Sequence, residues 1–534
     1  MTTSDRSTFA LTTPLYYVNG VPHMGSAYTT MAADALARFQ LLCGKEVLFI
    51  TGTDEHGQKI ERTAQERGVS PQEHCDEIVE GFKDLWTTLN IQYDRFSRTT
   101  SPRHEAIVKE FFQRVWDNGD IYLGQQTGWY CVGCEEFKEE KELLDDHVCP
   151  LHSNKKTEWR DEQNYFFRLS KYQKPLEEFL EKNPEFIQPK IRRNEVLNFI
   201  DNGLKDFSIS RVNLDWGFPV PEDPNHTLYV WFDALLGYIT ALLDPEDEPT
   251  LENALQKWWP MNLHLIGKDI LRFHAIYWPA MLMSAQLPLP DKVFGHGFLT
   301  KDGKKMGKSL GNTLDPVELV ETYGSDAVRF YFLKEIEFGR DGDFNEVRFI
   351  EKVNASLAND LGNLLNRTLK MAIKYFDGDI SSVDPQHISA DNPLKELGEK
   401  AGKAFLEAYT DLNFSKASEI ALNLARQGNK YIDDQAPWSL YKQGEEDQVK
   451  IVIYSVLETV RLSAFLLSPI IPEISSNIYQ QLGLSIGFTD NLILRQQGNL
   501  FSSQSNWGVL SPNQPLGKPS PVFQKLQPPA VVSS

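Results

Sequence analysis

The sequence predicts an α/β protein in which a parallel sheet of the Rossmann type is split by a connective insertion and followed by an α-helical bundle. Strand-like and helix-like segments alternate near the start of the chain. This alternation stops at about residue 122, resumes after about residue 224, and gives way to helical periodicity from about residue 345 to residue 467. Alternating strands and helices favour a parallel sheet with helices on both faces, whose ligands lie beyond the carboxyl ends of the strands.

The start of the chain shows the alternation most clearly. The expected elements are a strand over residues 8–15, a helix over residues 26–42, a short strand over residues 46–50 and a polar helix over residues 58–67, closed by Gly68. The turns that follow the two strands contain His23 and Asp54. We therefore expect both side chains at the ligand-binding edge of the sheet.

A chain of 534 residues is too long for one hydrophobic core and should divide into domains. The predicted parts are the first half of the sheet domain (1–121), the connective insertion (122–224), the second half of the sheet domain (225–344), the helical domain (345–484) and a tail (485–534). The tail is rich in Ser, Pro, Gln and Asn, so part of it is expected to be disordered.

Composition excludes several classes of protein. We find no apolar run of the ~18 residues that a membrane span needs and no signal-peptide pattern at the start, so a cytoplasmic protein is expected. Five unevenly spaced cysteines argue against a secreted disulfide framework. The formal charge of −20 counts against nucleic-acid binding by the whole surface, but residues 301–308 form a local basic cluster.

Two cysteine-containing pairs in the insertion predict a zinc site. Cys131-x-x-Cys134 and Cys149-x-x-His152 have the paired spacing of a tetrahedral Cys₃His site, in which four protein ligands complete the shell of a structural ion. The alternative is that these are unligated thiols in a surface insertion. The remaining cysteines, Cys43 and Cys75, have no partner pattern and are expected in the core.

Two short motifs indicate phosphate binding. In PLYYVNGVPHMGS, His23 stands just before a helix start, where backbone N–H groups and the helix dipole favour an anion. In KDGKKMGKSLGN, lysines interleave with glycines directly after a strand-like segment. A surface turn histidine and a solvated basic loop are the alternatives, because both motifs recur by accident.

Taken together, these motifs resemble the class I aminoacyl-tRNA synthetases. The family signatures HIGH and KMSKS stand here as residues 23–26, His-Met-Gly-Ser, and residues 305–309, Lys-Met-Gly-Lys-Ser, each with one departure at Ser26 or Gly307. Within this class the chain is most similar to the methionyl-tRNA synthetases, because TGTDEHG, WGFPVP, YVWFDALLGY, GKDILRFHAIYWPAML and GHGFLT occur in that family's order. The resemblance extends to about residue 480.

The resemblance implies the residues of the active site. For methionine they are Leu15, Tyr17, Asp54, Trp231, Ala234, Tyr238, His274 and Trp278; for ATP they are His23, Gly25, Ser26, Gly297, Lys305 and Lys308, of which His23, Lys305 and Lys308 are catalytic. Aromatic rings suit a polarisable thioether, and Asp54 is the natural partner of the substrate ammonium. Taken singly, each aromatic residue could equally be part of the core.

The same resemblance implies that the helical domain binds the anticodon through Asn363, Arg367 and Trp438. An exposed Trp offers a stacking face for an unpaired base, while Asn and Arg reach base edges. The alternative is that all three residues pack helices.

The expected function is methionine–tRNA ligase activity. With Mg²⁺ and ATP, methionine would form methionyl-adenylate and pyrophosphate, and the methionyl group would then pass to tRNA(Met), initiator and elongator. One structural zinc ion and a monomer are expected. The alternatives are a catalytically silent tRNA-binding protein of the same fold and a sister synthetase for leucine, isoleucine or valine. Those sister enzymes usually carry a larger, editing insertion.

Overall fold

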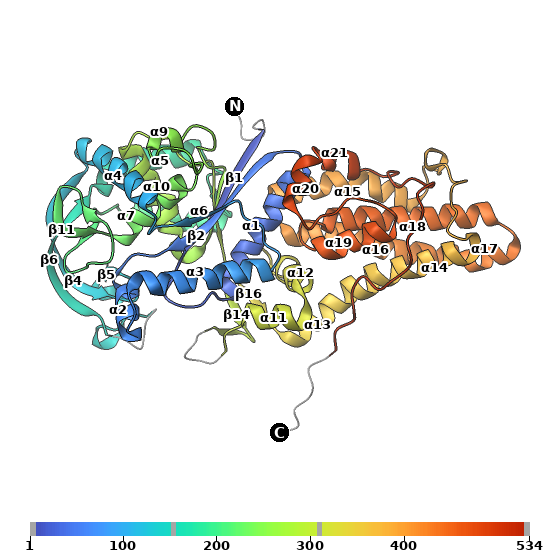
Figure 1. Cartoon of the computed structure of the whole chain (residues 1–534), viewed down its shortest axis with the longest axis horizontal. Coiled ribbons are helices and arrows are strands. Elements are labelled where there is room, and N and C mark those ends of the chain that lie inside the picture. Colours follow the sequence, from blue (N-terminus) through green and yellow to red (C-terminus); the bar gives the residue numbers. More distant parts are fainter. Residues whose placement is uncertain (1–6, 151–155, 307–311, 528–534) are drawn as a thin grey trace, which may run out of the picture. The chain divides into compact units, whose positions relative to one another are not determined.

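The computed structural model describes residues 7–150, 156–306 and 312–527. The chain divides into two compact units (Figure 1). The first comprises Met1–Pro22, Leu48–Asp84 and Tyr93–His296, and the second comprises His23–Val47, Leu85–Gln92 and Gly297–Ser534. Each unit is therefore assembled from segments that are distant in the sequence.

A six-stranded sheet organises the first unit. Its order is β3-β2-β1-β12-β13-β7, with bounds Arg95–Arg98, Glu46–Asp54, Thr8–Tyr17, Leu263–Gly267, Val293–His296 and Ile187–Gln188. The pairs β1 with β12, β12 with β13, β13 with β7 and β2 with β3 are all parallel. Strand β1 lies beside β12, so the predicted parallel sheet split by an insertion is confirmed.

Helices cover this sheet with apolar side chains. The helices of the first unit include α2 (Gln58–Arg67), α3 (Pro71–Thr88), α4 (Pro102–Asp117), α7 (Val230–Ala234), α8 (Gly237–Thr240), the π-helix η6 (Phe273–Tyr277) and α10 (Trp278–Ser284). Buried side chains from α4, α8 and α10 join those of the sheet in one core, which contains Ile50, Phe111, Ile239, Ile266 and Met281. Burying apolar area in this way is the main term that stabilises the unit.

The insertion has its own antiparallel sheet of order β5-β4-β6-β8, with bounds Glu136–Lys138, Ile121–Cys131, Glu158–Phe167 and Phe207–Ser208. A second small sheet has the order β10-β11-β9, with bounds Pro219–Val220, Asp223–Leu228 and Ser210–Arg211. The insertion also contains helices α5 (Gln173–Lys182) and α6 (Lys190–Asp201). Within the same segment, β7 pairs with β13, so the insertion also contributes the edge strand of the central sheet.

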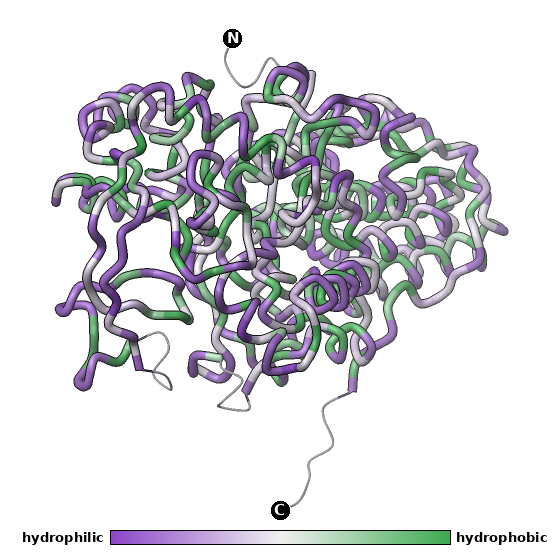
Figure 2. The backbone as a smooth tube through the Cα atoms, turned by 60° about the vertical axis from the view of Figure 1, so that its left-hand side comes forward, coloured by the Kyte–Doolittle hydropathy of each residue, from purple (hydrophilic) through white to green (hydrophobic). Residues whose placement is uncertain are grey.

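The second unit is mainly helical. It contains α1 (Met24–Leu42), α11 (Pro316–Tyr323), α12 (Ser325–Glu335), α13 (Glu346–Val353), the π-helix η8 (Asn354–Asn363), α14 (Leu364–Phe376), α15 (Pro393–Thr410), α16 (Phe414–Gln435), α17 (Pro437–Gln443), α18 (Glu446–Leu467) and α19 (Pro472–Gln481). A small sheet has the order β15-β14-β16, with bounds Lys304–Lys305, Leu299–Lys301 and Gly342–Phe344. Hydrophilic and hydrophobic residues alternate along these helices, as expected where one helix face is buried (Figure 2).

A buried ion cluster joins α1 to α12 within this unit. Arg38 donates to Asp34 at 2.8 Å, and Arg329 donates to the same carboxylate at 2.6 Å. All three side chains are buried, and Arg329 also donates to the carbonyl oxygen of Ile470. Because a buried charge is costly unless it is paired and hydrogen-bonded, this cluster fixes how α1 packs in the unit.

Residues 485–527, where irregular structure is predicted, contain two short helices, α20 (Asn491–Gln496) and α21 (Leu500–Gln504). Leu494, Leu510 and Val522 are buried. The Glu458 carboxylate accepts hydrogen bonds from three successive backbone amides, Gly508 to Leu510. This segment is therefore held by packing and by long-range hydrogen bonds, which leave no periodic signal in the sequence.

Candidate active site

His23 is the N-cap of α1. Its Nδ1 atom accepts a hydrogen bond from the Gly25 backbone N–H at 3.1 Å. Since Nδ1 accepts, the neutral ring carries its proton on Nε2, which can donate to a ligand. A Cβ atom at residue 25 would lie 2.9 Å from the His23 ring, so glycine is needed for this geometry. His23 is exposed, while Ser26, one turn into the helix, is buried.

Lys305 lies on a hairpin. Strands β14 and β15 are joined by a turn in which Asp302 (φ 51°) and Gly303 (φ 73°) both adopt left-handed conformations, the type I′ pattern of tight hairpins. Lys305 is exposed, and its carbonyl oxygen accepts from the Asn312 side chain. Gly307 and Lys308 lie outside the described residues.

Gly297 precedes this hairpin and allows two backbone segments to approach closely. A Cβ atom there would lie 2.2 Å from the Arg340 carbonyl carbon. His23, Gly25, Ser26, Gly297 and Lys305 are all within the second unit.

The eight residues predicted for methionine all lie in the first unit. Leu15 and Tyr17 end β1, Asp54 ends β2, Trp231 and Ala234 lie on α7, Tyr238 on α8, His274 on η6 and Trp278 at the start of α10. Three of these positions are at or after the carboxyl end of a parallel strand: the ends of β1 and β2, and η6, which follows β12. An open α/β sheet binds its ligands at these strand ends. A Cβ at Gly237 would lie 2.4 Å from Leu15 Cδ1, so the glycine leaves room for this leucine.

Tyr238 and His274 form a buried pair. The Tyr238 hydroxyl lies 2.8 Å from His274 Nε2, and His274 Nδ1 lies 3.0 Å from the Ile270 carbonyl oxygen. A carbonyl only accepts, so His274 donates from Nδ1 to Ile270 and accepts the hydroxyl proton at Nε2. Burial lowers the pKa of His274 to about 4, which agrees with a neutral ring. With its only proton donated to His274, the Tyr238 hydroxyl is held in a fixed orientation.

The two tryptophans have different surroundings. Trp231 is half-buried and stacks on Phe273, with ring centroids 3.9 Å apart and planes 5° from parallel. Trp278 is fully buried and packs against Phe111 and Trp259. The half-buried Trp231 ring is partly accessible, whereas Trp278 is part of the hydrophobic core.

Asp54 is the most unusual residue of this set. Its side chain is 5% exposed, and Oδ1 has no hydrogen-bond partner among the residues that the structure describes. Burial, followed by the nearby Asp233 and Glu135 carboxylates, raises the pKa of Asp54 well above its ordinary value. A buried carboxylate with an unpartnered oxygen is stabilised when a cation binds, such as the ammonium group of an amino acid.

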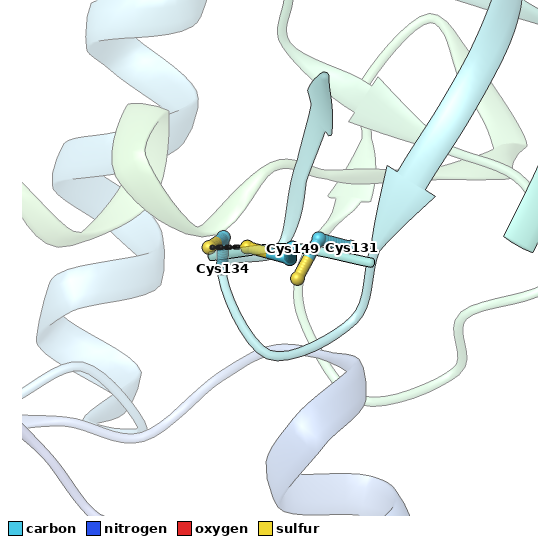
Figure 3. Close-up of side chains that lie close together, drawn as sticks. All are labelled: Cys131, Cys134 and Cys149. Carbon is cyan, nitrogen blue, oxygen red and sulfur yellow. Dashed lines mark hydrogen bonds between the residues drawn. The ribbon is translucent and has the colours of Figure 1, made fainter. Parts of the chain in front are cut away.

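The three predicted cysteine ligands lie together in the insertion (Figure 3). The sulfur atoms of Cys131, Cys134 and Cys149 all lie within 4.8 Å of one another, and those of Cys134 and Cys149 are 3.6 Å apart. Zn–S bonds of about 2.3 Å in a tetrahedron place sulfurs roughly 3.8 Å apart, so this cluster fits zinc and not a disulfide. His152 lies outside the described residues, and His147 stacks on Trp129 instead.

The predicted anticodon residues are accessible. Asn363 is exposed, and Trp438 on α17 is 41% exposed, which is high for so large an apolar ring. Arg367 on α14 donates to Asp433 at 2.9 Å and to Asn429 at 3.1 Å, so its guanidinium is held in a defined orientation. Both partners of Arg367 lie on α16, so this side chain also joins two helices of the domain.

Comparisons with known proteins agree with this geometry. The family of class I tRNA synthetases (M) matches residues 9–151 and 139–369, and the anticodon-binding domain of methionyl-tRNA ligase matches residues 389–495. The chain belongs to the methionyl-tRNA synthetases. The methionine–tRNA ligase of Nostoc sp. is 69% identical to this synthetase over 97% of both chains. The chloroplastic/mitochondrial ligase of Arabidopsis thaliana is 54% identical, over 98% of this synthetase and 84% of the relative.

A solved structure is also similar to this synthetase. Mycobacterium tuberculosis methionyl-tRNA synthetase in complex with methionyl-adenylate matches it with a TM-score of 0.88 at 39% identity, over 97% of this chain and 99% of that one. The predicted fold class, family and enzyme class, methionine–tRNA ligase, are thereby confirmed. The relatives support the ligase and not the silent tRNA-binding alternative. Within the described part of the synthetase, every helix is too short or too polar to cross a bilayer.

The eight residues predicted for methionine are called the methionine set below. The sequence analysis missed several polar residues near them. One Asp233 carboxylate oxygen lies 2.5 Å from His56 Nδ1, and the other lies 2.7 Å from His104 Nε2. Both histidines are buried. Burial alone would raise the pKa of Asp233, but these two histidines lower it to about 2. Such partners are brought together only by the fold, although the YVWFDALLGY motif that contains Asp233 was already identified.

His264 is a second missed residue. It lies on β12, is fully buried, and its Nδ1 atom is 2.8 Å from the Thr12 hydroxyl. Its ring lies 4.6 Å from that of Tyr238, and Nε2 has no partner within the described ranges. Burial, and then the neighbouring His274, lower the pKa of His264 well below its ordinary value, so the ring is neutral. It belongs to the wall behind Tyr238.

Proposed function

We propose that this synthetase activates L-methionine with ATP to give methionyl-adenylate and pyrophosphate, and then transfers the methionyl group to tRNA(Met), both initiator and elongator. The observation that carries this proposal is the buried Asp54 carboxylate, whose Oδ1 has no partner in the described structure, within the same unit as the Tyr238–His274 pair. Methionine carries both groups that these residues would bind: an ammonium group and a thioether. The names of the relatives, and the methionyl-adenylate held by the Mycobacterium tuberculosis enzyme, support the same substrate.

Asp54 would bind the substrate ammonium and so direct its carboxylate toward the α-phosphate of ATP. Tyr17, Leu15 and Trp231 would surround the side chain, with the Tyr238 ring beside the sulfur and Ala234 leaving space for it. Holding the two reactants in an attack geometry replaces a bimolecular encounter, and no enzyme nucleophile is needed.

ATP would be bound by His23, Gly25, Ser26, Gly297, Lys305 and Lys308. The Nε2–H of His23 at the start of α1 and the lysine ammonium groups would stabilise the charge that develops on the phosphates. Mg²⁺ would accompany ATP and neutralise part of the phosphate charge. These interactions strengthen in the transition state, so their loss lowers kcat more than methionine affinity.

One zinc ion is proposed for the insertion, with Cys131, Cys134, Cys149 and His152 as ligands. The thiol cluster of the structure supports the first three. With four protein ligands the ion would be structural. Zinc analysis of the purified synthetase should therefore give one ion per chain, and His152→Ala should weaken zinc binding.

Asn363, Arg367 and Trp438 are proposed to bind the anticodon of tRNA(Met). The exposed Trp438 ring would stack on an unpaired base, and Asn363 and the oriented Arg367 would reach base edges. A cytoplasmic monomer stays a prediction from the sequence.

Methionine-dependent ATP–pyrophosphate exchange without tRNA tests this function. Exchange with methionine, and none with leucine, isoleucine, valine or cysteine, is expected. Exchange with another amino acid would contradict the pocket assignment. Absence of exchange with all five would favour a silent tRNA-binding protein.

A further inference from the structure

Glu135 connects the cysteine cluster with the methionine set. It directly follows Cys134, is 5% exposed and has a left-handed backbone conformation with φ 53°. Its Oε1 atom accepts from the Tyr17 hydroxyl at 2.9 Å and from the Lys59 backbone N–H at 2.7 Å. Tyr17 and Lys59 are 118 and 76 residues away in the sequence. One carboxylate oxygen thus joins three distant segments of the first unit.

The bond to Lys59 caps α2. This helix begins after Gly57, which has no side chain to accept the first N–H groups and adopts φ 116°. The Glu135 carboxylate occupies the space where a Cβ of residue 57 would be, at 2.4 Å. Helix N-termini need an acceptor for their unpaired N–H groups, and a carboxylate there also interacts favourably with the helix dipole. Glu135 therefore supplies the cap from another part of the chain.

Both ends of this connection lead to proposed methionine ligands. Asp54 ends β2 and is separated from α2 by only three residues, so the position of the first turn of α2 limits the position of Asp54. Tyr17 ends β1 and presents its hydroxyl to Glu135. The Lys59 ammonium lies 5.8 Å from the centre of the Tyr17 ring, which brings these two segments together a second time.

The cysteine turn sets the position of Glu135. Strands β4 and β5 pair antiparallel around it, with Cys131 opposite Glu136, and Arg211 donates to the Glu135 carbonyl oxygen. A left-handed conformation at a residue other than glycine costs free energy and persists only where its surroundings impose it. The ligand turn of the proposed zinc site imposes it here.

We propose that Glu135 is a positioning residue for methionine binding: placed by the Cys131–Cys134 turn, its carboxylate holds Tyr17 and the first turn of α2 and so keeps Asp54 in place for the substrate ammonium. This proposal rests on the proposed function. Glu135 does not touch reacting atoms, so its loss acts on methionine binding more than on the rate of the bound complex. It also makes the geometry of the methionine site depend on the metal site.

The first test is kinetic. Glu135→Ala should raise KM for methionine about tenfold with kcat changed less than about twofold, because two partly buried hydrogen bonds are lost. Glu135→Asp keeps the charge but is one methylene shorter, and should show the same KM defect. Glu135→Gln keeps the accepting Oε1 and should restore KM. The matched control is Glu136→Ala, whose carboxylate contacts Lys138 and Arg272 instead, and which should leave KM unchanged.

A double-mutant cycle with Tyr17→Phe distinguishes positioning from general damage. If Glu135 acts through the Tyr17 hydroxyl, the effects of Glu135→Asp and Tyr17→Phe on methionine KM should be clearly less than additive. Additive effects, an equal defect in Glu136→Ala, or an unchanged KM in both Glu135→Ala and Glu135→Asp would overturn the proposal.

Hydrogen exchange gives a readout that needs no substrate. In Glu135→Ala the amides of residues 57–61 should exchange faster while the protein keeps one zinc ion, and chelation of the unaltered synthetase should cause the same change. Unchanged hydrogen exchange of these amides after chelation and in Glu135→Ala and Glu135→Asp would also overturn the proposal. A synthetase without methionine-dependent ATP–pyrophosphate exchange would instead contradict the proposed function. The hydrogen exchange of the amides would still decide the role of Glu135.

Discussion

The methionine set differs from the residues predicted to bind ATP, called here the phosphate-directed set. The difference lies in how much of each set's geometry the protein itself fixes. Asp54, Tyr238 and His274 are buried, and the last two are bonded to each other. His23 and Lys305 are exposed at a helix start and on a hairpin. A small, weakly polar ligand needs a close-fitting site that is built in advance, whereas phosphates bring enough charge to order solvated donors around them.

This difference implies two kinds of energetic cost. Keeping a carboxylate such as Asp54 buried with an unpartnered oxygen costs folding free energy, which the ligand recovers on binding. Solvated groups such as Lys305 cost the folded protein little. Substitutions in the first set should therefore change methionine affinity and stability together, and those in the second should change mainly the rate.

The largest effect is expected in the phosphate-directed set. His23→Ala and Lys308→Ala should each lower kcat of methionine activation about 10²- to 10³-fold, because a donor to developing charge is lost. In His23→Ala the free energy of unfolding should fall by only about 0.5–1 kcal/mol, because this variant loses the exposed N-cap hydrogen bond from Gly25. Pre-steady-state adenylate formation and thermal unfolding measure the two quantities. Lys304→Ala, on the β14–β15 hairpin, is the control, and a similar loss there would mean that these lysines act only through their total charge.

Asp54→Asn should have the next largest effect. Methionine KM should rise about 30-fold or more, the equivalent of the ~2 kcal/mol or greater loss of a buried charge partner. The free energy of unfolding near pH 7 should not fall, because a buried carboxylate with one unpartnered oxygen is removed. Urea unfolding and exchange kinetics measure both. A destabilised variant with unchanged KM would show that Asp54 is structural and would remove the contrast between the two sets.

The pH dependence of methionine binding follows from the raised pKa of Asp54. Only the ionised carboxylate attracts the ammonium, so affinity should rise about tenfold per pH unit below this pKa and level off above it. For folding the sign is opposite: the folded state binds more protons than the unfolded chain between about pH 4 and the raised pKa. This contribution of Asp54 to stability is full below that window and is lost as the pH rises through it. Calorimetry across pH measures both, and Asp54→Asn should abolish both dependences.

The smallest effect is expected for Tyr238→Phe. Losing the hydroxyl leaves His274 Nε2 buried without a donor, so methionine affinity should fall about three- to tenfold and stability by ~1–3 kcal/mol. Tyr454→Phe removes another buried hydroxyl, one that donates to the Leu510 carbonyl, and serves as the control: it should lower stability without affecting methionine. Equal effects on methionine would show that Tyr238 acts only through stability.

Local patterns predicted much of the fold. The expected helix over residues 58–67 and its end at Gly68 agree with α2, whose C-cap glycine has φ 72°, and the expected strand over residues 8–15 lies within β1. Strand β7 was not predicted because two residues carry no periodic signal. Helices α20 and α21 were missed for the same reason, since they are too short to show an amphipathic repeat.

The site shows the same division. Motif order predicted the cysteines that the structure brings together and the residues at the ends of β1 and β2. It did not find Glu135, Asp233 or His264, whose partners lie 118, 177 and 252 residues away. A side chain that acts by supporting another has no spacing of its own, because the fold alone determines which distant residues it meets.

Calorimetric titration with methionine, without ATP, tests the central contrast most directly. The unaltered synthetase and His23→Ala should bind methionine with the same Kd, and Asp54→Asn should bind it about 30-fold or more weakly. Equal weakening in His23→Ala and Asp54→Asn, or equal affinity in all three proteins, would contradict a methionine site that is built separately from the phosphate-directed groups.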